Sequence, residues 1–480
     1  MKMRERSWIR KMLCLVLLVS MILPAPSVFA TSDMFTSLTH LEDRLPVRSS
    51  DPYGQVLYGT LPSAYRSTAV TSVKDQRPYG TCSYFATISS VESHAIAHKV
   101  KVGKKTATTS LDLSERHLLY FLHHKKADSL GGLKGDSTST TGSAATDGGV
   151  LVANAFQLLT WAGPVKESTA PYAKIHSKLS AKKAYKNVLH VQGFELIPMQ
   201  QMDRVKRAVM SSGSAAVGFY YNNAYFHPGN AAYCCPWSQD PNHAVNIVGW
   251  DDHYSRSNFV YPPATDGAWL CKNQWSTGWG NKGYFWLSYE EPSLVNSPAY
   301  TFQTKSATSY KYNYQYDGGV AFDGLQLRPE QGSKFTAANI FTVKGAQKQK
   351  LMAVGVATFS QDIRYSIQIY KNPKSGKPLS GKKMLSKAQT GTIREAGFVT
   401  IPLKKSVKLK KGDKFTVAVT LKAADGPTIL TDVSSTIGNI KSKTKQKKKQ
   451  SYIIVNGQKL DLAGYKSGST ARIKAYTKKY

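Results

Sequence analysis

Four residues along the chain have the types needed for hydrolysis through a cysteine nucleophile: Gln76, Cys82, His243 and Asn273. A cysteine reacts as its thiolate, which is scarce at neutral pH unless the surroundings favour it. An imidazole within reach takes the thiol proton and later protonates the leaving amine. We therefore predict nucleophilic attack on a peptide carbonyl, with Cys82 as the nucleophile and His243 as the acid and base.

Asn273 and Gln76 have supporting roles in this hypothesis. The histidine ring must be held in one orientation, and a side-chain amide that accepts its second ring proton does this; Asn273 is the candidate. The attacked carbonyl becomes an oxyanion, which needs two donors already in place. We assign these donors to the side-chain NH2 of Gln76 and the backbone N–H of Cys82.

The nucleophile is expected at the start of a helix. Apolar residues recur at three- to four-residue steps over 82–98, which predicts a helix there. A helix N-terminus carries unpaired N–H groups and partial positive charge, and both favour a thiolate. The Gly-, Ser- and Thr-rich stretch 128–149 is predicted to be a loop. Further helices are predicted at 114–124, 150–162 and 202–212.

From residue 214 onward strand patterns dominate, in the runs AAVGFYY, HAVNIVGW, GAWLCKNQW and GYFWLSY. His243 begins the second of these runs, and Asn273 lies in the third. Residues 311–480 alternate apolar and polar residues between turn formers, which is typical of an all-β sandwich. Helices followed by strands indicate an α+β fold.

The flanks of these residues resemble the papain-like cysteine peptidase family. VTSVKDQRPYGTCSYFA is similar to the family's nucleophile segment, NHAVNIVGW to its histidine strand, and WLCKNQWSTGWGNKGYFWL to its asparagine segment. The resemblance implies a peptidase with a helical and a β-rich lobe over residues 58–305, and an acyl-enzyme thioester. It also implies that Gly148 and Gly149 bind the substrate backbone and that Trp275 shields the His–Asn hydrogen bond.

The sequence departs from the family pattern at two positions near the nucleophile. Ser83 stands where the family usually has a tryptophan, and Tyr79 stands where it usually has a disulfide cysteine. The family's disulfide pattern is therefore not carried over. Whether Cys234, Cys235 and Cys271 pair is left open by the sequence.

The N-terminus has the pattern of an export signal. Residues 1–30 combine a basic start, a short apolar stretch and small residues before Ala30, so we predict a cleaved signal peptide. Residues 31–57 are predicted to be a short N-terminal pro-segment, because the family's long pro-region is missing. If this segment inhibits, it does so as a short arm lying in the cleft. We expect no transmembrane or covalent anchor.

The positive charge is concentrated in the C-terminal part of the chain. The formal net charge is +34, and residues 311–480 supply +24 of it, with 33 Lys and Arg against 9 Asp and Glu. These residues contain no His, Cys or Trp, so they suit binding rather than catalysis. A surface this basic attracts polyanions, which for an exported protein are anionic cell-wall polymers or glycans. No nucleic-acid motif is present, and we do not expect nucleic acid as a partner.

Residues 311–480 resemble the lectin-like domain that follows the peptidase in surface-associated proteases of Gram-positive anaerobes. The resemblance rests on Tyr316-Asp317-Gly318, on the run 337–341 and on the closing strand 472–477. It implies carbohydrate or wall association, sometimes with calcium. The sequence contains no evident acidic calcium loop, so we assign no metal ligand and expect no required cofactor.

We therefore predict a secreted cysteine endopeptidase, free or non-covalently associated with the cell surface. Two alternatives remain open. A catalytically inert surface-binding protein is compatible with Ser83 in place of tryptophan. A peptidoglycan stem-peptide hydrolase of a different Cys/His fold would lack the glutamine before the cysteine, and Gln76 argues against it.

Overall fold

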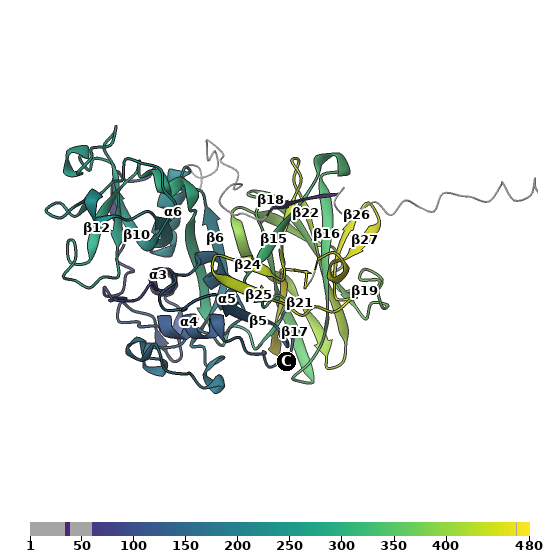
Figure 1. Ribbon diagram of the computed structural model, residues 1–480. Helices are drawn as coiled ribbons and strands as arrows, with labels where there is room; N and C mark the ends of the chain where they lie inside the picture. Colours follow the sequence, from purple (N-terminus) through teal and green to yellow (C-terminus); the bar gives the residue numbers. More distant parts are fainter. Residues whose placement is uncertain (1–33, 39–59, 467) are drawn as a thin grey trace, which may run out of the picture.

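The computed structural model describes residues 34–38, 60–466 and 468–480. The predicted signal peptide and most of the predicted pro-segment lie outside these residues. Figure 1 shows a first unit that carries the helices and a second unit built almost entirely of strands. None of the helices within the described ranges combines the length and the apolar character needed to cross a bilayer.

The predicted helices are confirmed, with small differences at their ends. Ser114 caps its helix as expected, because its hydroxyl accepts a hydrogen bond from the His117 N–H at 3.1 Å. Gly213, with φ +84°, ends the last of them in a left-handed conformation. The helices are α3 (Cys82–Ala97), α4 (Glu115–His123), α5 (Leu151–Leu159) and α6 (Met202–Ser212).

A β-rich lobe follows the helices. Its strands are hydrogen-bonded in the order β6-β13-β7-β10-β11-β12-β9-β8, and β2 also pairs with β10. This lobe has a core of its own, separate from the core around α3, α4 and α5. Its strands are β2 (Ala64–Arg66), β6 (Leu189–Ile197), β7 (Ala215–Phe219), β8 (Phe226–His227), β9 (Ala232–Tyr233), β10 (His243–Asp251), β11 (Ala268–Lys272), β12 (Tyr284–Ser288) and β13 (Ala299–Ser306).

The second unit is the predicted β-sandwich. Apolar residues of β17 and β22, from two different sheets, share one buried core, so the sheets pack face to face. Its main strands are β14 (Tyr312–Tyr314), β15 (Phe322–Leu327), β16 (Lys334–Thr342), β17 (Lys348–Thr358), β18 (Ile363–Lys371), β19 (Lys382–Lys383), β20 (Gln389–Ile393), β21 (Ala396–Lys410), β22 (Lys414–Lys422), β23 (Thr428–Asp432), β26 (Ser451–Val455), β27 (Gln458–Asp461), β28 (Thr470–Ala471) and β29 (Ile473–Lys479). The α+β organisation is thus confirmed.

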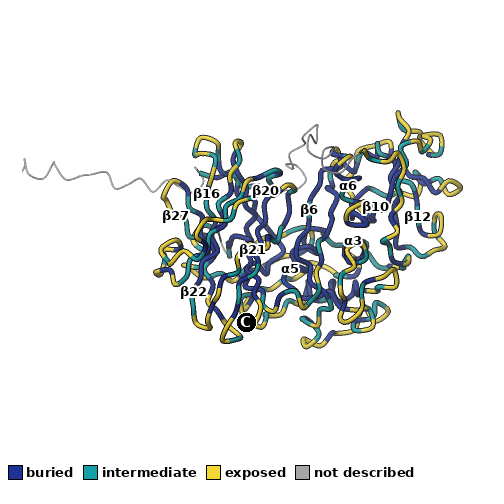
Figure 2. The backbone as a smooth tube through the Cα atoms, turned by 180° about the vertical axis from the view of Figure 1, so that it is seen from behind, coloured by how far each residue is buried: buried dark blue, intermediate teal, exposed yellow. Residues whose placement is uncertain are grey.

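The two units are joined by a continuous sheet. Strand β21 pairs with β6, with Phe398 opposite Phe194, so the order β14-β29-β17-β21 runs on into the β-rich lobe. Phe398 and Leu430 of the second unit also belong to the core around α3 and α5. Figure 2 shows buried backbone passing through α5, β6 and β21 at this junction. The two units therefore share backbone hydrogen bonds and apolar contacts.

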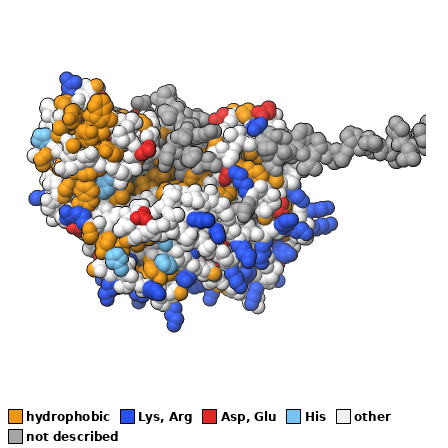
Figure 3. Space-filling model, viewed as in Figure 1, with side chains coloured by type: hydrophobic (Ala, Val, Ile, Leu, Met, Phe, Trp, Pro, Cys, Tyr) orange, Lys and Arg blue, Asp and Glu red, His pale blue; other side chains and the backbone are white. Residues whose placement is uncertain are grey.

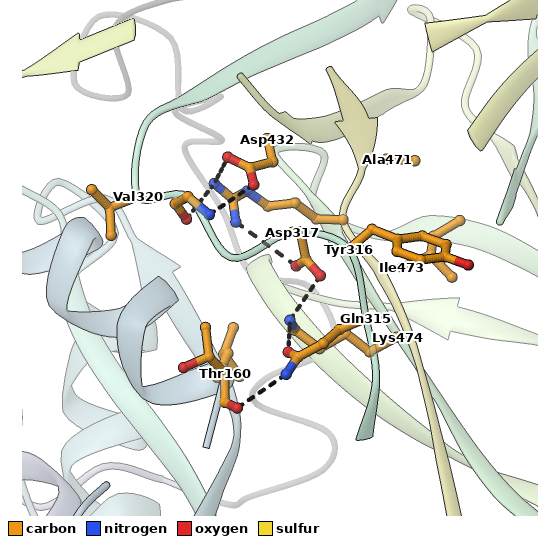
Figure 4. Close-up of polar contacts among 12 residues, drawn as sticks. Thr160, Gln315, Tyr316, Asp317, Val320, Asp432, Ala471, Ile473 and Lys474 are labelled. Atoms are coloured by element: carbon orange, nitrogen blue, oxygen red, sulfur yellow. Dashed lines mark hydrogen bonds and ion pairs between the residues drawn. The ribbon is translucent and has the colours of Figure 1, made fainter. Parts of the chain in front are cut away.

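A buried ionic network lies at the same junction (Figure 4). The Arg472 guanidinium lies 3.6 Å from the ring centre of Phe156 in α5 and donates to the Ala321 carbonyl at 2.7 Å. It also pairs with Asp432 at 3.4 Å. Because both charged groups are fully buried, each depends on the other for its charge to be tolerated.

A second cation extends this network toward the helices. Lys474 Nζ donates to Asp317 at 2.8 Å and to the Gln315 side chain at 2.7 Å. Gln315 in turn donates to the Thr160 carbonyl, just after α5, at 3.1 Å. Figure 4 shows this chain of contacts passing from the second unit to the helical lobe.

Part of the stretch predicted as a loop is a strand. Residues 128–149 include β5 (Ser137–Thr140), which pairs with β25 (Ile440–Lys443) of the second unit. The prediction was wrong here because the partner strand lies about 300 residues away and leaves no local signal. Two further short elements are β1 (Phe35–Leu38), which pairs with β15, and the hairpin of β3 (Lys101–Val102) and β4 (Lys105–Thr106) after α3.

Candidate active site

Cys82 is the first residue of α3 and is half-buried. The capping position before it, Thr81, makes no side-chain cap, so its hydroxyl does not occupy the N–H groups of the first turn. Burial raises the pKa of the Cys82 thiol, while the nearby backbone N–H groups of Ala244, Ser83 and Cys82 itself lower it. The thiol therefore lies among donors that favour a negative sulfur.

His243 Nε2 and Asn273 Oδ1 are 2.9 Å apart. The backbone N–H of Gln274 donates to the same Oδ1 atom, also at 2.9 Å, which identifies this atom as the amide oxygen. An oxygen accepts only, so Nε2 must carry a proton and Nδ1 is the open acceptor of the neutral ring. Burial lowers the pKa of His243 to about 4, and the bond to Asn273 opposes that shift.

Strand pairing brings these segments together. β10 begins at His243 and β11 ends just before Asn273, and Asn246 lies opposite Lys272 in the antiparallel pair. The Asn246 side chain donates to the Ala86 carbonyl of α3 at 2.9 Å, which fixes β10 against the nucleophile helix. The Ala244 N–H acts on the Cys82 sulfur, so the start of β10, where His243 lies, is beside the thiol.

Trp275 covers the histidine. Its ring is stacked on that of His243, with ring centres 4.5 Å apart and planes 29° apart. The rings of Tyr221 and Trp279 meet the Trp275 ring edge-on, with their ring centres 4.9 and 5.1 Å from its centre. These rings form an aromatic cluster against His243, and Tyr221 and Trp279 were not assigned roles from the sequence.

Gln76 is buried beside the nucleophile loop. Its Nε2 donates to the Tyr79 carbonyl at 2.8 Å, which leaves the second amide proton for another acceptor. Its backbone N–H donates to the Gln274 carbonyl at 2.9 Å, so it is tied to the asparagine segment. Sequence reasoning missed Tyr172, whose hydroxyl donates to the Gln76 carbonyl at 2.8 Å and accepts from Thr81 at 2.6 Å.

The glycine pair lies against the residues that follow the nucleophile. A Cβ atom added to Gly149 would come within 2.4 Å of Ser83 Oγ, so only glycine fits there. Gly148 has φ +77°, a conformation that glycine adopts readily. The Gly80 N–H donates to the Ala145 carbonyl at 2.8 Å, which holds this segment beside the loop before Cys82.

Figure 3 shows a hollow lined by hydrophobic side chains between the β-rich lobe and the helices below it. Cys234, Cys235 and Cys271 are buried and form no disulfide in the described chain. Within the described ranges no group of three or more His, Cys, Asp or Glu side chains is placed to hold a metal ion. The hypothesis that calcium binds the second unit remains untested.

Known proteins match both units. Residues 63–302 match the family model of the papain family cysteine proteases, and residues 313–477 match that of the lectin-like domain. Cysteine proteinase 2 of Entamoeba histolytica is 25% identical over 265 residues, which cover 52% of this chain and 72% of the relative. Cathepsin K of Gallus gallus is 27% identical over 46% of this chain and 57% of its own length. The chain spans only about half the length of several other curated relatives.

A solved structure covers both units together. The cysteine protease and lectin-like domains of Cwp84, a surface layer associated protein of Clostridium difficile, are 26% identical to this chain with a TM-score of 0.71. The alignment covers 88% of this chain and 90% of that one. A second structure of that protease, after propeptide cleavage, has a TM-score of 0.70. Since the family model matches half of its residues, the chain belongs to the papain family of cysteine proteases and carries a lectin-like domain.

Proposed function

We propose that the protein is a secreted cysteine endopeptidase in which Cys82 and His243 exchange a proton. The observation that carries the proposal is the His243 ring, whose bond to Asn273 requires a proton on Nε2 and which begins the strand whose Ala244 N–H lies at the Cys82 sulfur. Burial disfavours a lone thiolate and a lone imidazolium alike. Transfer of the proton from Sγ to Nδ1 creates both charges together, and each then stabilises the other.

Each step of the proposed reaction uses one of these groups. The thiolate bonds to the substrate carbonyl carbon, and the electron pair moves to the oxygen, which accepts from the Gln76 amide and the Cys82 N–H. Collapse breaks the C–N bond, and the imidazolium of His243 gives its proton to the departing amine. Water then attacks the thioester, His243 takes its proton, and the acid leaves as the Cys82 thiol is restored.

The first test replaces Cys82. We expect Cys82→Ala to hydrolyse no peptide, while its melting temperature stays near that of the wild type. Titration with an epoxide peptide mimic should label one thiol in the wild type and none in the variant. Hydrolysis retained by Cys82→Ala would refute the proposal, and a wild type that is neither labelled nor active would favour the inert binding protein. Release of stem peptides from peptidoglycan without cleavage of protein would favour the other alternative.

The second part of the proposal concerns location. The N-terminal pattern supports export, and sequencing of the mature N-terminus tests it; an unprocessed Met1 would contradict export by cleavage. Cwp84 is a surface layer associated protein, which supports surface association of this chain. Lys and Arg side chains gather over the second unit on the face shown in Figure 3.

Strand register places like charges opposite one another on this unit. Lys350 of β17 is paired with Lys408 on β21 and with Lys478 on β29. Like charges directly opposite on a sheet are destabilising. No ion pair of these three with an acid is found among the described residues. We propose that this row binds anionic wall polymers, because phosphate or carboxylate groups would relieve the repulsion.

Binding is best measured on the full chain, because the second unit shares a sheet with the peptidase. The ligand would be purified teichoic acid, and the protein would carry Cys82→Ala to prevent self-cleavage. Replacing Lys350, Lys408 and Lys478 with Gln should weaken binding and make it less sensitive to salt. The matched control replaces the row Lys334–Lys422–Arg364 on the other sheet, which removes the same charge. Equal loss in both variants, or binding indifferent to salt, would contradict the assignment to the first row.

A further inference from the structure

A hairpin of the lectin-like domain reaches into the peptidase. It consists of β24 (Ser435–Ile437) and β25 (Ile440–Lys443), joined by a two-residue turn. β25 pairs with β5, with Ile440 opposite Thr140 and Lys443 opposite Ser137. The hairpin and β5 therefore form one three-stranded sheet. β5 leads along the chain to the glycine pair, Gly148 and Gly149, and the turn of the hairpin lies at the end of the sheet nearer that pair.

The turn touches both sides of the glycine pair. The Asn439 side chain donates to the Asp147 carbonyl, directly before Gly148, at 3.2 Å. On the other side, a Cβ atom added to Gly438 would come 2.7 Å from Val150, the residue directly after Gly149. Two consecutive residues of the second unit thus meet this stretch: Asn439 bonds the backbone before the glycine pair, and Gly438 lies close to the Val150 side chain after it.

The segment has few other hydrogen bonds to the rest of the described chain. In the described chain, one hydrogen bond links residues 141–149 to the nucleophile loop, from the Gly80 N–H to the Ala145 carbonyl. Two others come from the hairpin: the Asn439 side chain to Asp147, and the Thr141 N–H to the Asn439 carbonyl at 3.4 Å. The remaining hydrogen bonds of the segment are internal or join it to its neighbour Thr140. Two of the three hydrogen bonds that tie the segment to other parts of the described chain therefore come from the hairpin.

Asn439 controls the orientation of a specific N–H group. The Asp147 carbonyl and the Gly148 N–H belong to one planar peptide unit, so fixing the oxygen fixes the direction of the N–H. Gly148 has no side chain to restrain this peptide unit, and its φ of +77° is one that other residues rarely adopt. Among the described residues, the bond from Asn439 is the hydrogen bond that fixes the oxygen of this peptide unit.

We propose that the β24–β25 hairpin is part of the substrate groove and that Asn439 is a positioning residue for the glycine pair. This inference rests on the proposed function, in which Gly148 and Gly149 bind the extended backbone of the substrate. The lectin-like domain then contributes to recognition of peptides as well as to any surface attachment. Substrates that reach the glycine pair depend on the hairpin, and reagents that meet only the sulfur do not.

The test compares a long and a short substrate on the full chain. Asn439→Asp keeps the side-chain size but replaces the donor with a carboxylate that faces a carbonyl. We expect kcat/KM for a peptide with four residues before the cleaved bond to fall roughly five- to tenfold, mainly through KM, the effect of one lost hydrogen bond. Hydrolysis of a single-residue N-acyl ester and alkylation of Cys82 by iodoacetamide should stay within about twofold. Asn439→Gln keeps an amide donor and should recover part of the loss.

Another two-residue turn with an asparagine and a glycine, Asn456-Gly457 in the same domain, provides the matched control. Asn456, between β26 and β27, donates to the Gln331 carbonyl at 3.0 Å, and both residues lie in the second unit. Asn456→Asp should leave every rate unchanged. An unchanged KM for the long peptide in Asn439→Asp, an equal change in Asn456→Asp, or a parallel fall in ester hydrolysis and alkylation would each overturn the inference.

The ester assay separates this failure from failure of the proposed function. Loss of ester hydrolysis in Cys82→Ala establishes the thiol mechanism without using the glycine pair. If the wild type hydrolyses the ester while Asn439→Asp behaves as the wild type on the long peptide, the thiol mechanism stands and the hairpin has no role. If the wild type hydrolyses neither substrate, the proposed function fails, and the inference falls with it.

Discussion

Removal of His243 should convert Cys82 from a reactive thiol into an inert one. Burial raises the thiol pKa above its ordinary value of 9.0, and a neighbouring imidazolium is what offsets this cost in our proposal. At pH 7 a thiol with that ordinary pKa is only about 1% ionised. If most of the wild-type sulfur is ion-paired thiolate, His243→Ala lowers the alkylation rate at pH 7 by about 100-fold or more.

The assay is the rate of iodoacetamide alkylation at Cys82 between pH 5 and pH 10, read by mass spectrometry. The wild-type rate should stay nearly flat around neutrality, whereas the His243→Ala rate should rise about tenfold per pH unit through pH 8. Cys82→Ala gives the background from the buried Cys234, Cys235 and Cys271. If the variant is alkylated at pH 7 as fast as the wild type, the imidazole does not take the thiol proton and the reasoning fails.

Three further changes test other parts of the structure. Asn273→Ala should lower kcat by about 10- to 100-fold with little change in KM, because the His243 ring loses the acceptor that orients it; an unchanged kcat would remove Asn273 from the mechanism. Arg472→Met should lower the free energy of unfolding by about 3–5 kcal/mol in urea titrations, because Asp432 is left buried without its partner; a neutral effect would show that the pair can be dispensed with. Burial lowers the pKa of His190 to about 3, so this group contributes stability above pH 6.5 that is lost as the pH falls toward 3. Protonation of His190 should lower the free energy of unfolding by about 2 kcal/mol between neutral pH and pH 5. His190→Gln should remove this part of the pH dependence, measured by urea unfolding at a series of pH values.

The sequence predicts those elements whose signals are local. The helix at Cys82 follows from apolar spacing within the helix itself, and the strands that carry His243 and Asn273 follow from short apolar runs. The bond between His243 and Asn273 needs only that two neighbouring strands pair in one register. These residues could therefore be assigned before any coordinates, and the structure brings His243 and Asn273 into contact.

The missing parts are those that depend on distant partners. Tyr172 ties Gln76 to Thr81, yet it lies in a polar turn whose sequence carries no hint of either. β5 is a run of Ser and Thr that becomes a strand only because β25 lies beside it. The residues around Tyr172 and β5 carry no sequence pattern that indicates these contacts, so both contacts could be found only from the folded chain.

The distribution of charge in the second unit follows from what its two sides contact. At the junction, Arg472 and Lys474 are fully buried, and each is matched by an aspartate. At the far ends of β17, β21 and β29, Lys350, Lys408 and Lys478 face one another, and no acid is paired with them among the described residues. A desolvated cation must be paired, whereas a solvated one can be left for a ligand. The junction cations therefore lie between the lectin-like domain and helix α5 of the peptidase, while the lysine row remains available to an anionic surface.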